Sequence, residues 1–199
     1  MITRALMGLF QKLNGTARFE HDSIGDVLRG IFGRTLQAIA MSYLPIPAAV
    51  RVALHRMRGV KIGKNVFMGP GCFLDVTRPD LLVIEDDVSL AGQVTILTHS
   101  DPTEPLREIL GPESRVFKPV VIKRGAWVTV NCTILPGVTI GENAIIAAGS
   151  VVNKDIPPMV IAGGQPARVV RKITHHAEAT ATSEVEDKAK DDAEAAAGG

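Results

Sequence analysis

The sequence predicts an all-β fold in which short strands wind into a parallel β-helix. An aliphatic residue recurs at every sixth position in three runs between Ile62 and Val152. The fifth position of each unit is small, and the fourth is rich in Asn, Asp and Gly, which tolerate turn or left-handed dihedrals. A helical period of 3.6 residues would lose this register within two turns. Each unit is therefore a short strand followed by a corner, and stacked coils would bury the first positions.

The repeat can be followed residue by residue, and three units complete one triangular coil. Its first positions are Ile62, Met68, Leu74, Ile84, Leu90, Ile96, Ile122, Val128, Ile134, Ile140, Ile146 and Val152. Its fifth positions are Val66, Cys72, Val88, Val94, Ala126, Cys132, Val138, Ala144 and Ser150. Its fourth positions are Asn65, Gly71, Asp87, Gln93, Gly125, Asn131, Gly137, Asn143, Gly149 and Asp155. His99 falls at the same fourth, corner position in the unit that begins at Ile96.

Residues 1–58 predict a basic, helical segment before the repeat. The most apolar window, residues 36–54, is interrupted by Pro45, Pro47 and Arg51, so it does not read as a membrane span. Two helices separated by the Leu-Pro-Ile-Pro break would cap the open end of the β-helix. Alternatively, a basic amphipathic helix over residues 48–58 would rest on an anionic membrane surface.

Residues 174–199 predict a disordered tail, because this stretch is acidic, rich in Ala and poor in apolar anchors. Nucleic-acid binding is not expected, since the few aromatic residues of the basic end are typical of helix cores. Cys72 and Cys132 fill small positions of the repeat, which favours buried free thiols over a disulfide. Residues 1–13 lack the apolar core of an export signal, so we expect a cytoplasmic protein.

The repeat is interrupted directly after His99, in the sequence Val94-Thr-Ile-Leu-Thr-His-Ser-Asp. The loop over residues 100–119 is too polar and too rich in proline to continue the coil. A histidine where a long loop leaves a rigid scaffold is well placed for catalysis, although the same residue could serve only as a polar corner.

Residues 60–173 resemble the hexapeptide-repeat acyltransferases with a left-handed β-helix, in particular the maltose and galactoside O-acetyltransferases. The resemblance is carried by the repeat over residues 121–155, by the loop, and by the ending Ile156-Pro-Pro-Met-Val-Ile-Ala-Gly-Gly-Gln-Pro-Ala-Arg-Val-Val-Arg. It implies residues 59–173 as the catalytic domain, a homotrimer, and acetyl-coenzyme A (acetyl-CoA) as donor. It also implies that His99 is the general base that takes a proton from the acceptor hydroxyl in a ternary complex.

The resemblance further implies a set of donor-binding residues: Trp127, Ala148, Asn153, Lys154, Arg168 and Arg171. The three cations would bind phosphates, whereas Asn153 replaces the family's usual Thr. A lone surface cation is usually only solvated, and Trp127 could instead support a subunit interface.

The acceptor is expected to be the hydroxyl of a sugar or glycan, with Asp75 and Asp80 as candidate carboxylates that bind it. Either carboxylate could equally be a polar corner. Two rival functions remain. A non-catalytic scaffold would have no need for His99, the loop and the cation cluster together. A zinc site of the γ-carbonic anhydrase type needs three histidines within the coils, where only His99 lies, so no metal is expected.

Overall fold

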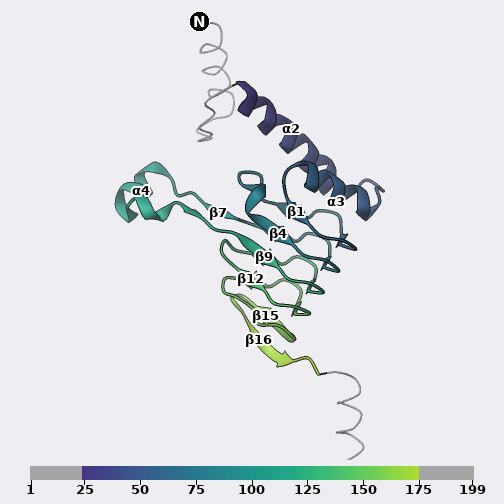
Figure 1. The fold of residues 1–199 in the computed structure, drawn as a ribbon. Helices are drawn as coiled ribbons and strands as arrows, with labels where there is room; N and C mark the ends of the chain where they lie inside the picture. Colours follow the sequence, from purple (N-terminus) through teal and green to yellow (C-terminus); the bar gives the residue numbers. More distant parts are fainter. Residues whose placement is uncertain (1–23, 175–199) are drawn as a thin grey trace, which may run out of the picture.

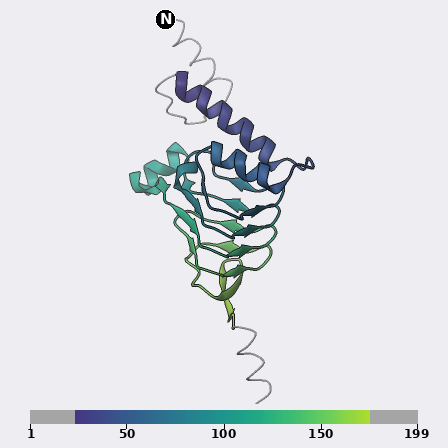
Figure 2. The ribbon, with the colours of Figure 1, turned by 45° about the vertical axis from the view of Figure 1, so that its right-hand side comes forward.

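A computed structural model describes residues 24–174, and they form a three-sided stack of parallel strands beneath two helices (Figures 1 and 2). The strands of each side hydrogen-bond to those of the coil above and below, so three sheets run along the stack. Sheet A contains β1 (Lys61–Ile62), β4 (Leu82–Ile84), β9 (Val120–Ile122) and β12 (Thr139–Ile140). Sheet B contains β2 (Phe67–Met68), β5 (Ser89–Leu90), β10 (Trp127–Val128), β13 (Ile145–Ile146), β15 (Val160–Gly164) and β16 (Ala167–Lys172). Sheet C contains β3 (Phe73–Leu74), β6 (Thr95–Ile96), β11 (Thr133–Ile134) and β14 (Val151–Val152). The predicted parallel β-helix is confirmed.

The buried core consists mainly of the first positions of the repeat, stacked coil upon coil, together with the small fifth positions. In sheet C, for example, Leu74 lies beside Ile96, and Ile96 lies above Ile134 and Val152. All four side chains are completely buried. Each coil therefore lends its neighbours an apolar surface, and stability is shared between adjacent coils.

The corners of the coils have the backbone geometry that the fourth positions predict. Nine of the ten fourth positions have a positive φ, including the non-glycine residues Asn65, Asp87, Gln93, Asn131 and Asn143, and Asp155 is the exception. These are the residue types that enter the left-handed region at the lowest cost. Cys72 and Cys132 are buried free thiols, as predicted.

Two helices lie over the first coil (Figure 1). Helix α2 (Ile24–Met41) and helix α3 (Ala48–Met57) lie on either side of the proline-containing break. The buried Arg51 side chain of α3 donates to the carbonyl oxygens of Ala40, Ser42 and Leu44, at 2.9–3.0 Å. These bonds satisfy carbonyl groups at the end of α2 and fix the turn between the helices.

The segment after β6 leaves the stack and projects from its side (Figure 1). Strands β7 (His99–Ser100) and β8 (Val116–Phe117) pair antiparallel at its root. Between them lie helix α4 (Glu104–Leu110) and the short 3-10 helix η2 (Pro112–Ser114). Another 3-10 helix, η1 (Pro79–Leu81), lies between β3 and β4.

The predicted tail over residues 174–199 lies outside the described residues except for Thr174, and so does most of the first half of the predicted segment 1–58. None of the helices over residues 24–174 has both the length and the apolar character needed to cross a membrane.

Candidate active site

The candidate site lies at one edge of the β-helix, where the chain passes from sheet C to sheet A. We call this the C–A edge; it comprises residues 75–81, 97–119, 135–138 and 153–155. In the lower coils the edge is a tight corner. In the first two coils it widens, into η1 and into the projecting loop. The widened corners bring Asp75 and His99 together.

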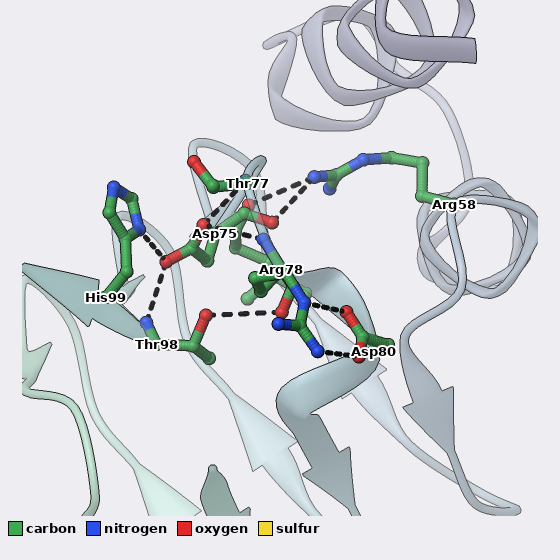
Figure 3. A network of polar contacts seen from close by, with 8 residues as sticks. Arg58, Asp75, Thr77, Arg78, Asp80, Thr98 and His99 are labelled. Carbon is green, nitrogen blue, oxygen red and sulfur yellow. Dashed lines mark hydrogen bonds and ion pairs between the residues drawn. The ribbon is translucent and has the colours of Figure 1, made fainter. Parts of the chain in front are cut away.

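His99 is hydrogen-bonded to a buried carboxylate. Its Nδ1 lies 2.6 Å from Oδ2 of Asp75 (Figure 3). The Asp75 side chain is completely buried, whereas the imidazole is 27% exposed. Figure 3 shows the other ring nitrogen of His99 pointing away from Asp75. Within residues 24–174, no hydrogen bond engages that nitrogen, Nε2, which leaves it free to meet a ligand.

Backbone groups hold the Asp75 carboxylate from both sides. Oδ2 also accepts from the N–H of Thr98 at 2.7 Å, and Oδ1 accepts from the N–H of Thr77 at 2.7 Å and of Arg78 at 3.4 Å. Burial by itself would raise the pKa of Asp75, but the hydrogen bonds from His99, Thr98 and Thr77 outweigh burial and lower it. The carboxylate is thus ionised at neutral pH, and His99 donates its Nδ1–H to it.

The ring of His99 is also held by the base of the projecting loop. Phe117, its partner across β7 and β8, stacks on it with ring centroids 5.9 Å apart and planes inclined by 18°. The guanidinium carbon of Arg115, the residue directly before β8, lies 5.1 Å from the centre of the Phe117 ring. The imidazole is therefore fixed both in its plane and along its face.

Two predictions about this edge need correction. His99 is not a corner residue, because it lies on β7 and is not among the residues with positive φ. The hexad count fails there because the chain has already left the coil to pair with Phe117. Asp75 was expected to bind an acceptor hydroxyl, but its buried oxygens are occupied by His99 and by backbone N–H groups. Asp80 is exposed and forms an ion pair with Arg78, at 2.7 Å.

The predicted donor-binding residues fall into two groups on one chain. Asn153 and Lys154 are exposed on the C–A edge, below His99. Trp127 and Ala148 are exposed on sheet B and at the corner that follows it. Arg168 and Arg171 are exposed on β16, also in sheet B. One copy of the chain therefore does not bring all of these residues together with His99.

Sequence reasoning missed Thr98 and Phe117, which contact Asp75 and His99. The available signal for Thr98 is its place directly before His99, where the repeat is interrupted, but no pattern indicates that Phe117 pairs with His99. In the part of the chain that the structure describes, no cluster of three or more His, Cys, Asp or Glu side chains could hold a metal ion.

Comparison with known proteins agrees with this architecture. The bacterial transferase hexapeptide (six repeats) family matches residues 119–154. Galactoside O-acetyltransferase from Escherichia coli is 36% identical over 116 residues, which are 56% of this chain and 56% of that protein. An Escherichia coli acetyltransferase provisionally assigned to colanic acid biosynthesis is 33% identical over 135 residues, 61% of this chain and 74% of that one. The chain thus spans only about half the length of the galactoside enzyme.

Solved structures show the same fold. A hexapeptide-repeat acetyltransferase from Vibrio cholerae superposes with a TM-score of 0.62 at 27% identity, covering 78% of this chain and 96% of that one. The same Vibrio cholerae protein has also been solved with acetyl-CoA. The three-sided β-helix and the hexapeptide repeat define a hexapeptide-repeat transferase. The chain belongs to the family of hexapeptide-repeat acetyltransferases, which includes the galactoside and maltose O-acetyltransferases.

Proposed function

We propose that this protein transfers an acetyl group from acetyl-CoA to a hydroxyl of a sugar or glycan. The observation that supports this most strongly is the 2.6 Å contact between Nδ1 of His99 and the buried Asp75 carboxylate. Such a pair fixes the tautomer in which Nε2 carries a lone pair and can accept a proton. We also propose that the β-helix winds with a left-handed sense, as it does in the family.

In the proposed reaction, Nε2 of His99 takes the proton of the acceptor hydroxyl. The hydroxyl oxygen then attacks the thioester carbonyl carbon, and the tetrahedral intermediate collapses with cleavage of the carbon–sulfur bond. The departing thiolate takes up the proton held by His99, so the products are an acetyl ester and the free thiol of coenzyme A. Asp75 remains ionised throughout and stabilises the imidazolium that forms between the two proton transfers.

We propose that the complete site lies between two copies of the chain in a homotrimer. His99 and Lys154 lie on the C–A edge, whereas Trp127, Ala148 and Arg168 lie on sheet B and the corner after it. If all of them serve one donor molecule, two chains must supply them. Helix α4 has exposed apolar side chains, including Ile109 at 79% and Leu110 at 58%, that a neighbouring copy would cover.

The acceptor would lie against the widened corner of the first coil. Arg78 and Asp80 are exposed there, next to the backbone that carries Asp75 (Figure 3). A guanidinium and a carboxylate offer donors and acceptors that suit the hydroxyl groups of a sugar. Relatives that act on galactosides, or that are assigned to colanic acid biosynthesis, support a carbohydrate acceptor. The cytoplasmic location and a peripheral contact of the N-terminal segment with the membrane stay predictions.

The test is a screen of acyl-CoA donors against sugar and oligosaccharide acceptors. Free thiol is measured together with the mass of the acetyl ester, so that hydrolysis is not mistaken for transfer. Asp75→Asn should lower the rate, since the amide no longer stabilises the imidazolium. Asp86→Asn is the matched control, because the Asp86 carboxylate accepts from the N–H of Lys64 on another edge of the β-helix. A folded protein that acetylates no acceptor from any donor would leave the scaffold as the better account.

A further inference from the structure

Two arginines at the end of helix α3 reach the outer side of the first coil. Within residues 24–174 no coil precedes the first one, so carbonyl groups on that side need other donors. Arg58 donates to the carbonyl oxygens of Leu74 and Asp75, at 3.3 and 2.8 Å. Arg56 donates to the carbonyl oxygens of Ile62, at 3.1 Å, and of Gly63.

The carbonyl groups that the two arginines bind occupy equivalent positions in the repeat. The N–H of Asp75 donates to Ile96 in the next coil, and the N–H of Gly63 donates in the same way to Ile84. Arg56 and Arg58 therefore hold matching pairs of carbonyl groups at two different edges. Only the pair held by Arg58 includes the residue whose carboxylate contacts His99.

Arg58 is itself held firmly by both helices. Its guanidinium donates to Nδ1 of His55 at 2.8 Å and to Oε1 of Gln37. Figure 3 shows the Arg58 side chain extending toward the backbone of Asp75. Burial lowers the pKa of Arg58 to about 10, and the negative charge of Asp75 opposes that shift. Arg58 is thus a cation at neutral pH, and it lies against the backbone of the residue that orients the base.

We propose that Arg58 is a positioning residue for the Asp75–His99 pair. Through the Asp75 carbonyl, it fixes the backbone from which the carboxylate extends, and the N–H groups of Thr77 and Thr98 fix the carboxylate itself. The inference rests on the proposed function, since it assigns Arg58 a part in holding the proposed base. Helices α2 and α3, which hold Arg58, would then help to position the base in addition to covering the first coil.

The test compares Arg58→Met with Arg56→Met, which removes the equivalent arginine from an edge without the base. Arg58→Met should lower kcat by about tenfold to a hundredfold, because small displacements of a base have effects of that size. The KM for acetyl-CoA should not change. Arg58→Lys keeps the charge but reaches fewer acceptors, so it should recover part of kcat. Arg56→Met should lower the melting temperature but leave kcat within about twofold.

A second readout does not depend on turnover. In protein labelled with nitrogen-15 histidine, the His99 signal, assigned by its loss in His99→Asn, should report a protonated Nδ1 in the wild type and in Arg56→Met. In Arg58→Met a mixture of tautomers should appear. If Arg58→Met does not fold, the Arg58→Lys spectrum and rate decide the matter. Equal effects of the Arg56 and Arg58 variants, or a wild-type tautomer in Arg58→Met, would overturn the proposal. A wild type that transfers no acetyl group would contradict the proposed function alone, and the spectra would still decide the role of Arg58.

Discussion

The C–A edge differs sharply between the upper and the lower coils of the same β-helix. In the third coil the edge is the short corner over residues 135–138, closed by Gly137 with φ of 86°. In the first two coils the same edge holds a 3-10 helix and a loop with a helix of its own. The strands before these corners remain in register, with Leu74, Ile96 and Ile134 stacked. Chemistry can therefore be built into corners without disturbing the buried stack.

The largest expected effect is on the rate of acetyl transfer, and it comes from a substitution on the C–A edge that should leave the buried stack stable. His99→Asn removes the proposed base while keeping a polar side chain, so the transfer rate should fall by about 10² to 10⁴. The melting temperature and the affinity for acetyl-CoA should stay near wild-type values, because His99 adds nothing to the apolar core. Steady-state kinetics and calorimetry on the same preparations check this. A variant that folds, binds donor and transfers acetyl at the wild-type rate would show that the base lies elsewhere.

A substitution in the buried stack should instead lower stability and leave the transfer rate unchanged. Ile134 is completely buried in sheet C between the coil of His99 and the coil of Lys154. Ile134→Ala should lower the free energy of unfolding by about 2–5 kcal/mol through lost burial and a cavity. The rate per folded molecule should hardly change. Thr133→Ala, at the outward-facing neighbour on β11, serves as the control and should cost about 0.5 kcal/mol or less. Denaturant titrations measure both values, and a similar cost at the two positions would argue against a stack supported mainly by its first positions.

A smaller effect should mark the lower part of the edge. If Lys154 contacts the 3′-phosphate of the donor, Lys154→Ala should weaken binding of acetyl-CoA by about tenfold or more, since a charge-assisted hydrogen bond is lost. Binding of dephospho-CoA should be unaffected. Lys64→Ala is the control, because Lys64 is an exposed cation on a corner of the first coil. Equal affinities of wild type and Lys154→Ala for both ligands, measured by titration calorimetry, would remove Lys154 from the donor site.

A further effect concerns the dependence of stability on pH and the helices above the first coil. Burial and the charge of Arg58 lower the pKa of His55 to about 3. Between about pH 6.5 and about pH 3, the unfolded chain binds a proton at His55 that the folded chain does not, so stability is lost as the pH falls. The contribution to the slope is up to about 1.4 kcal/mol per pH unit. His55→Gln, which keeps an acceptor for Arg58, should show a shallower loss in denaturant titrations across this range. Parallel profiles would mean that His55 does not remain neutral in the folded state.

The difference between the periodic buried stack and the widened corners of the C–A edge decides how much of the structure could be predicted from the sequence. The stack follows a local rule, with a large and a small buried residue in most units of six, so strands, corners and buried cysteines could be predicted from the pattern. The site depends on what happens when that rule stops. The antiparallel pairing of His99 with Phe117 joins residues on either side of the loop, and no periodicity specifies it. Asp75 could be proposed as a functional carboxylate, but its partner could not, because the contact crosses from one coil to the next.

The position of Asp75 and His99 on neighbouring coils also bears on how the protein opens. Repeat structures unravel from their ends, since each coil is held mainly by the one beside it. The first coil is held from above by α3, through Arg56 and Arg58. If the helices and the first coil detach, the lower coils with Lys154 and Arg168 stay stacked, but the carboxylate leaves the imidazole. Partial opening at this end would therefore stop acetyl transfer while donor binding is retained. On heating, activity would be lost at a lower temperature than the one at which the whole stack unfolds.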